Sequence, residues 1–249
     1  MRDPSPLREA LAFLTPFPGA RRPSPHALRW FPAVGAAIGG MLGGLWWGTA
    51  RLWPQAVAAA IIVAADLALT GMLHFDGLTD SADGLLPSHL TTERRLSVMR
   101  EPAVGAFGAA AAVVVLLSRW AVFATLRPSG WTVVLVAALW CVSRASMATV
   151  VGRFHYVRPD SGDDAGLAGA FLGAPFPPWA AALVLGAAVA VAALWKFPGG
   201  PVAVLAGLAA FAAVVVLGVR RLGGYTGDVL GAAGLVGETV GLVVAAAKW

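Results

Sequence analysis

The chain has 249 residues, of which 58% are hydrophobic and 12% are charged. An ordinary soluble domain carries about twice that charged fraction, so the composition indicates an integral membrane protein. The net charge of +5 is carried by basic residues dispersed between apolar runs, which argues against a nucleic-acid partner. The single cysteine, Cys141, excludes an intrachain disulfide and a cysteine-based metal cluster.

The N-terminal segment, residues 1–29, is expected to lie on the cytoplasmic side. It has no unbroken apolar stretch and no small-residue cleavage motif, so we do not expect a removed signal peptide. Its short amphipathic piece, PLREALAFLTPF, is predicted to lie on the membrane surface.

Seven apolar runs follow, each near the length of about 20 residues that a helix needs to cross a bilayer core. They cover residues 30–50, 55–74, 104–124, 131–151, 179–196, 201–219 and 229–247. Glycine-rich faces such as GAAIGGMLGG suit close packing between such helices. The sequence therefore predicts an all-α, polytopic transmembrane helical bundle that forms one integral-membrane domain over residues 1–249.

The charged residues of the loops are distributed unevenly. With a cytoplasmic N-terminus, most of the arginines fall in inner loops, as the positive-inside rule requires. All four histidines fall on the inner side, and none of the acids falls in an outer loop. A transporter needs polar groups along a path through the bilayer, whereas an enzyme with a cytosolic substrate needs them at one face. The distribution favours an enzyme.

The stretch HFDGLTDSADGLL places three aspartates directly after the second apolar run. Asp76, Asp80 and Asp83 share one face if this stretch is helical. Carboxylates this close repel one another unless a cation neutralises them, and hard oxygen ligands suit Mg²⁺ or Mn²⁺. We therefore predict a metal-assisted phosphate site, with Gly77 and Gly84 allowing close approach of a pyrophosphate. The alternative is a solvated loop in which the aspartates cap helix ends.

Neighbouring polar residues are candidates for the same site. His74 is a candidate proton acceptor. Arg95 and Arg100, in ERRLSVMREP, are candidate substrate ligands, with a role as positive-inside anchors as the alternative.

Four charged residues fall in or beside predicted spans: Asp66, Arg119, Arg144 and Glu238. Charges in a bilayer are costly unless they are paired or face a wet cavity. Arg144 is a candidate substrate ligand and Glu238 a candidate metal ligand. Electroneutral pairing inside the bundle is the alternative for these residues.

Two further segments carry candidates. GGYTGDVLGAAGLVGE opens the last span with a loop rich in backbone N–H groups, so Gly227 is a candidate substrate contact. Asp228 is a candidate metal ligand or, alternatively, a helix N-cap. The long loop 152–178 is predicted to be cytoplasmic and to act as a substrate lid or a flexible connection, with Arg158 as a candidate substrate ligand.

In their order along the chain, these motifs resemble the cobalamin synthase family, also called adenosylcobinamide-GDP ribazoletransferases. The resemblance rests on HFDGLTDSADGL, RLSVMREPAVGAFG, the Ser143–Arg144 pair and GGYTGDVLGAAGLVGE, and it covers nearly the whole chain from FLTPFP onward. Glu101, with the proline after it, and Asp66 depart from the family pattern.

The resemblance implies a multispanning transferase of the bacterial inner membrane that acts late in cobalamin biosynthesis. Such an enzyme joins adenosylcobinamide-GDP to α-ribazole or its 5′-phosphate and releases GMP with Mg²⁺ present. The resemblance assigns the metal and pyrophosphate role to Asp76, Asp80 and Asp83, with Asp228 as a further candidate. It also matches Arg100, Arg144 and Glu238 to charged positions of the family.

The expected partners are the two small-molecule substrates, the lipid bilayer and possible neighbouring cobamide-assembly enzymes. The sequence leaves two alternative functions open. DSADG resembles the opening of the CDP-alcohol phosphotransferase motif, but the rest of that motif is missing. An ion-coupled transporter would use Asp66, Arg119, Arg144 and Glu238 as its path.

Overall fold

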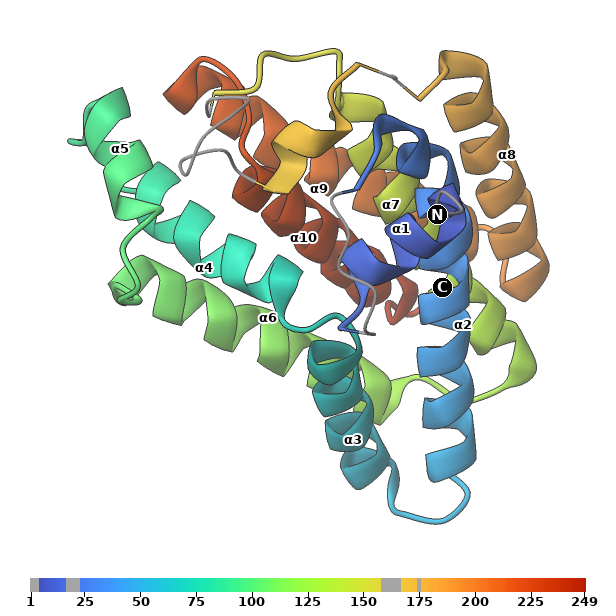
Figure 1. Cartoon of the computed structure of the whole chain (residues 1–249). Coiled ribbons are helices and arrows are strands. Elements are labelled where there is room, and N and C mark those ends of the chain that lie inside the picture. The colour runs from blue at the N-terminus through green and yellow to red at the C-terminus, as the bar shows by residue number, and fades with distance from the viewer. Residues whose placement is uncertain (1–4, 17–22, 158–166, 174–175) are drawn as a thin grey trace.

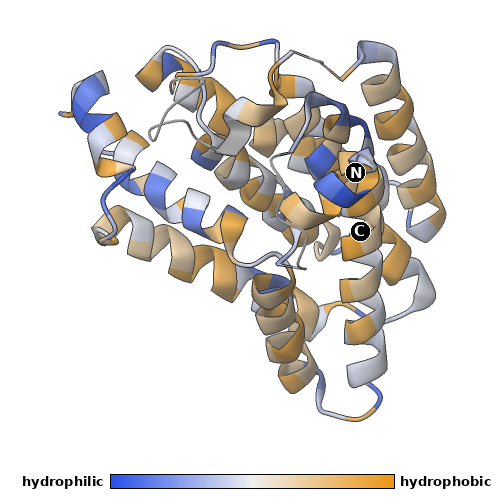
Figure 2. Ribbon diagram, in the orientation of Figure 1, coloured by the Kyte–Doolittle hydropathy of each residue, from blue (hydrophilic) through white to orange (hydrophobic). Residues whose placement is uncertain are grey.

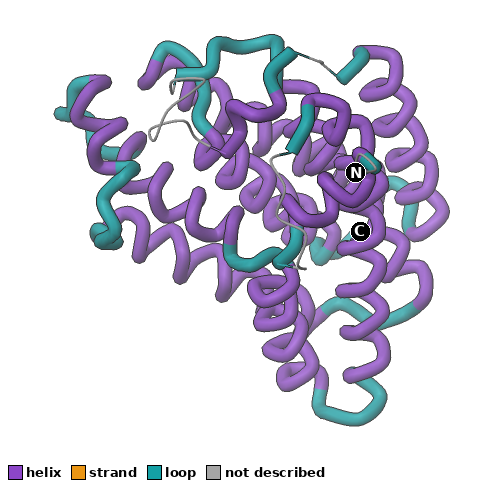
Figure 3. Tube along the Cα trace, in the orientation of Figure 1, coloured by secondary structure: helices purple, strands orange, loops and turns teal. Residues whose placement is uncertain are grey.

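The computed structural model describes residues 5–16, 23–157, 167–173 and 176–249, and within them the chain is helical (Figures 1 and 3). The helices in chain order are α1 (Pro6–Leu14), η1 (Pro25–Trp30), α2 (Phe31–Thr49), α3 (Gln55–Leu69), α4 (Leu73–Leu85), α5 (Thr92–Val98), α6 (Ala106–Thr125), α7 (Gly130–Val150), η2 (Leu167–Phe171), α8 (Pro178–Trp195), α9 (Gly199–Leu222) and α10 (Gly227–Ala245). The all-α helical bundle predicted from the sequence is confirmed.

Each of the seven apolar runs contains a helix, but fewer than seven qualify as spans. Among the described residues, α6, α7, α8, α9 and α10 are long and apolar enough to cross a membrane, and the bent pair α3 and α4 makes up to six. The helix α2 is not among them. In Figure 2 hydrophilic residues gather on α4 and α5, while α3, α6 and α8 are mostly hydrophobic. The chain is a multi-pass membrane protein.

Glycines let the central helices touch backbone to backbone. Gly35, Gly39 and Gly43 recur every fourth residue on α2, and a Cβ added at Gly39 would lie 2.8 Å from the Val136 carbonyl oxygen of α7. Lipid gives helices no hydrophobic reason to associate, so close van der Waals contact must hold them together. The role predicted for the glycine-rich face of residues 30–50 is confirmed.

The second predicted run does not continue as one helix to residue 74. Gly71 and Met72 both have left-handed backbone conformations, with φ of 56° and 59°. They end α3 at Leu69 and turn α4 by 89°. This bend lays the polar α4 against α6 and α10 instead of extending the line of α3 (Figure 1).

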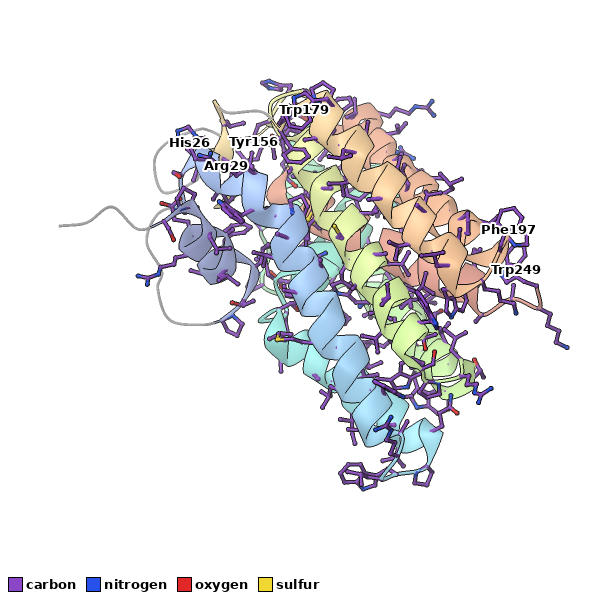
Figure 4. All side chains as sticks on the ribbon, turned by 90° about the vertical axis from the view of Figure 1, so that its right-hand side faces the viewer. His26, Arg29, Tyr156, Trp179, Phe197 and Trp249 are labelled. Atoms are coloured by element: carbon purple, nitrogen blue, oxygen red, sulfur yellow. The ribbon has the colours of Figure 1, made fainter. Side chains whose placement is uncertain are left out.

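The N-terminal helices cover one end of the bundle. The buried Glu9 of α1 accepts a 2.8 Å hydrogen bond from the Ser24 backbone N–H, which ties α1 to the segment before η1. At this end Figure 4 places His26, Arg29, Tyr156 and Trp179, whereas Phe197 lies at the opposite end of α8. Exposed aromatic side chains at both ends match the belts that membrane proteins present to the two bilayer interfaces.

Candidate active site

A cavity of about 150 Å³ lies between α4, α7 and α10, with α1, η1 and η2 over it; we call it the α4–α10 pocket. Its polar lining residues are His74, Asp76 and Asp228, with Gly227 beside them. The remaining lining residues are Phe13, Leu28, Phe31, Leu73, Met147, Val151, Phe171, Leu230 and Gly231. The pocket thus brings together candidates from two motifs that are far apart in the sequence.

Close contact between α4 and α10 places the two aspartates on one cavity. A Cβ added at Gly77 would lie 2.8 Å from the Asp228 carbonyl oxygen, and one at Gly231 would lie 3.2 Å from His74 Cα. The sequence predicted that Gly77 and Gly84 allow a pyrophosphate to approach the backbone. This prediction is wrong, because protein atoms lie where a Cβ would be at both positions. Gly84 lies against the Met99 side chain.

Asp228 lies in the first turn of α10 but does not cap it. The N-cap is Thr226, whose Oγ1 accepts a hydrogen bond from the Val229 N–H at 3.3 Å. The same hydroxyl lies 3.3 Å from Asp228 Oδ2 and donates to it. Thr226 thus holds both the helix end and the carboxylate that borders the cavity.

Asp83 points away from the pocket toward the start of α6. Its Oδ2 accepts a hydrogen bond from the Gly105 N–H at 2.7 Å, and its Oδ1 accepts one from the Gly108 N–H at 2.9 Å. Both carboxylate oxygens therefore satisfy N–H groups that a helix N-terminus leaves unpaired. The predicted convergence of Asp76, Asp80 and Asp83 is not found.

Within the described ranges, no three His, Cys, Asp or Glu side chains come together to hold a metal ion. Asp76 and Asp228 nevertheless present hard oxygen donors to the same cavity. Mg²⁺ commonly uses one or two carboxylates and takes its other ligands from water and substrate phosphates. The pair fits that donor set, and Asp80 lies one helical turn from Asp76 on α4, partly buried.

The predicted arginine ligands are placed elsewhere. Arg95 is buried, and its guanidinium donates hydrogen bonds to the carbonyl oxygens of Gly84 and Pro87, both at 2.7 Å. It therefore closes the C-terminal end of α4 and does not reach the pocket. Arg100 is exposed after α5, and Arg158 lies outside the described residues.

Arg119 joins three helices below the pocket. Its guanidinium pairs with Asp66 of α3 and, through Nη2 at 2.7 Å, with Glu238 Oε2 of α10. Its Nε donates to Thr239 Oγ1 at 2.8 Å. The arginine predicted to be costly in a span is thus fully paired.

Arg144 completes the same network from α7. Its Nη1 pairs with Glu238 Oε1 and donates to Ser143 Oγ at 2.9 Å. Each oxygen of Glu238 therefore accepts from a different arginine. The two arginines balance Asp66 and Glu238, so the alternative of electroneutral pairing is confirmed, and neither Arg144 nor Glu238 lines the pocket.

His74 lines the pocket from the first turn of α4. Its side chain is buried, and its Nδ1 has no hydrogen-bond partner among the described residues. An imidazole nitrogen without a protein partner is available to a substrate group. His74 can therefore accept a proton as well as contact a ligand.

Three phenylalanines also line the pocket, and no sequence pattern predicts them. Phe13 of α1, Phe31 of α2 and Phe171 of η2 come from three separate segments, so no local motif marks them. Phe171 places part of the long loop 152–178 over the pocket, as a lid would require. Residues 158–166 and 174–175 of that loop lie outside the described residues.

Comparisons with known proteins agree with the motifs. A family model described as cobalamin-5-phosphate synthase matches residues 6–246. Three curated relatives carry the name adenosylcobinamide-GDP ribazoletransferase. The Roseiflexus sp. (strain RS-1) protein is 34% identical, covering 96% of this chain and 88% of the relative. The Deinococcus radiodurans protein is 35% identical, and the match covers 97% of this chain and 82% of the relative. The Ralstonia pickettii protein is 36% identical, and the match covers 84% of this chain and 79% of the relative. No solved structure matches this chain.

Proposed function

From the premise that the chain belongs to the cobalamin-5-phosphate synthase family, and is thus a transferase of cobalamin synthesis, we propose the reaction that takes place at the α4–α10 pocket. A hydroxyl of α-ribazole, or of its 5′-phosphate, attacks the corrinoid-side phosphorus of adenosylcobinamide-GDP. The new P–O bond forms at this phosphorus. At the same time the bond breaks between this phosphorus and the oxygen that bridges it to the second phosphorus. The products are adenosylcobalamin, or its 5′-phosphate, and GMP.

The observation that carries this proposal is that Asp76 and Asp228, from two separate motifs, line one cavity with His74. Asp76 and Asp228 would hold Mg²⁺. When bound, Mg²⁺ neutralises the charge on the pyrophosphate and on the departing phosphate. His74 accepts the proton of the attacking hydroxyl, because its Nδ1 has no other partner in the described part of the chain.

The surrounding fold supports this chemistry. The hydrogen bond from Thr226 orients the Asp228 carboxylate. His74 is buried, which limits the access of bulk water to its Nδ1. Gly227 opens α10 with backbone N–H groups at the pocket, where the helix N-terminus favours an anionic substrate.

The proposed location is the cytoplasmic face of the bacterial inner membrane. Phe31 and Val151, which line the pocket, are close in sequence to Arg29 and Tyr156, which Figure 4 places at one end of the bundle. Gly227 belongs to the same end, because Tyr225 pairs with Tyr156. Basic residues concentrate in the loops of this end, as the positive-inside rule expects of a cytoplasmic face.

The transporter alternative loses its main argument. Asp66, Arg119, Arg144 and Glu238 were its proposed path, but they pair with one another and neutralise their charges. A path for ions needs groups that exchange partners with the passing ion.

The test is GMP release from adenosylcobinamide-GDP and α-ribazole 5′-phosphate by the purified protein in detergent, with Mg²⁺ or with EDTA. We expect release that requires both substrates and Mg²⁺ and that matches cobamide formation mole for mole. A well-folded protein that releases no GMP under either condition would refute the proposal.

A further inference from the structure

The lining of the α4–α10 pocket has two chemically different parts. His74, Asp76 and Asp228 come from the first turns of α4 and α10, and we call them the polar end. Phe13, Phe31 and Phe171 come from α1, α2 and η2, and we call them the phenylalanine cluster. The pocket is therefore built for a ligand with a polar half and an apolar half.

The rings of the phenylalanine cluster are arranged for a flat aromatic partner. Phe13 meets Phe171 edge-on with ring centroids 4.7 Å apart, and Phe31 meets Phe171 edge-on at 5.2 Å. Phe13 and Phe31 lie 5.9 Å apart and nearly parallel. Edge-to-face and offset contacts are the geometries that aromatic rings prefer, and a planar ligand extends them.

The apolar part of the lining selects between the two aromatic bases of the proposed reaction. The other apolar side chains of the lining are Leu28, Leu73, Met147, Val151 and Leu230, and none of them offers a strong hydrogen-bond donor or acceptor. Guanine has donors and acceptors along its edges, and burying them here would leave them unpaired at a large cost. Dimethylbenzimidazole, the base of α-ribazole, carries two methyl groups and no exocyclic polar group.

We propose that the phenylalanine cluster binds the dimethylbenzimidazole base of α-ribazole; this inference rests on the proposed function and names the substrate half that the pocket takes. The ribose then lies between the cluster and the polar end, so that a ribose hydroxyl faces His74. The pyrophosphate of the corrinoid substrate meets the hydroxyl at Asp76 and Asp228, and its guanosine lies outside the cluster. Phe13, Phe31 and Phe171 are thus determinants of base specificity.

The kinetic test uses Phe31→Leu and Phe171→Leu, each of which keeps an apolar side chain but removes the ring. We expect each substitution to raise the KM for α-ribazole 5′-phosphate about fivefold to tenfold, and the KM for adenosylcobinamide-GDP less than twofold. Phe123→Leu is the matched control, because Phe123 is equally buried but packs on Trp46. Its two KM values should stay at those of the unaltered protein.

A second measurement needs no substitution and therefore does not depend on how a variant folds. The unaltered protein should use the α-ribazole nucleotide at least tenfold more efficiently, as kcat/KM, than the nucleotide with adenine in the same α linkage, because adenine buries unpaired polar groups. Equal use of the two would overturn the inference. So would variants that raise the KM of the corrinoid substrate, or that change neither KM.

Failure of the proposed function has a different signature from failure of this inference. Without GMP release by the unaltered protein, the reaction is refuted, and calorimetric titration with α-ribazole alone then tests the cluster. Binding that Phe171→Leu weakens would uphold the cluster, and binding that it leaves unchanged, or no binding, would overturn it. With normal GMP release and unchanged KM values in both variants, only the cluster is refuted.

Discussion

Asp76 of α4 and Asp228 of α10 border the same cavity, while Asp83, on the same helix as Asp76, is hydrogen-bonded to the start of α6. Two of the three aspartates of the HFDGLTDSADGLL stretch therefore have different tasks. One contributes to the reactive end of the pocket, and the other fixes the helix that carries it.

His74→Gln should lower kcat by about two to four orders of magnitude with little change in either KM. Glutamine keeps a polar side chain of similar reach but accepts no proton at neutral pH. Steady-state rates of GMP release measure the effect, and they should also show that the decline of kcat on the acid side of the pH profile is lost in the variant. If the kcat of the variant stays within threefold of normal, His74 is not the proton acceptor.

Asp83→Ala should destabilise the protein without removing catalysis. The substitution leaves the N–H groups of Gly105 and Gly108 without their partner, which costs about 1 to 2 kcal/mol of unfolding free energy. Thermal unfolding in detergent measures the loss, and the rate per folded molecule should stay within about threefold of normal. A variant that keeps full stability but loses activity would show that Asp83 takes part in the reaction.

Glu238→Gln should destabilise the bundle strongly, by about 3 kcal/mol or more, because it leaves the buried Arg144 without its acid. The double variant Glu238→Gln, Arg144→Met should be more stable than Glu238→Gln alone, since it also removes the stranded cation. Denaturant unfolding of the single and double variants measures this coupling.

Glu101→Gln serves as the control for the buried pair, because Glu101 pairs with Arg94 on the exposed surface. Its Tm should match that of the unaltered protein. If Glu238→Gln behaves like Glu101→Gln, the buried network does not hold the helices together.

Gly77→Ala should reduce kcat at least tenfold, because the added Cβ would lie 2.8 Å from the Asp228 carbonyl oxygen and force α4 away from α10. Displacing catalytic groups by about an ångström is enough for such a loss. Gly40→Ala is the control, since a Cβ there meets no atom within 4 Å. Equal rates for both variants would show that the two helices need not touch.

Much of the fold follows from local patterns. Apolar runs of the right length located the helices, and the glycine spacing of residues 35, 39 and 43 marked the face of α2 that meets α7. The cost of unpaired charge in a bilayer also gave pairing inside the bundle as the alternative role for Arg119, Arg144 and Glu238, and that alternative is the one the structure shows. These features depend on the residues of one segment at a time, so the sequence carries them directly.

The remaining features depend on where distant segments meet. Hydropathy continues through Gly71 and Met72, so it does not reveal their left-handed conformations or the 89° turn that follows. Asp83 shares a helical face with Asp76, and only the approach of α6 gives it different partners. The phenylalanine cluster is assembled from three segments and has no pattern in any one of them.

The central claim is that Asp76 and Asp228, and not the three aspartates of α4, form the metal-dependent reactive pair. It is tested most directly by the rate of GMP release at increasing Mg²⁺ for Asp76→Asn, Asp228→Asn and Asp83→Asn. The account predicts that the first two lose at least about two orders of magnitude at saturating Mg²⁺ while remaining folded, and that Asp83→Asn keeps the normal Mg²⁺ dependence. Normal rates for Asp228→Asn, with loss for Asp83→Asn, would contradict it.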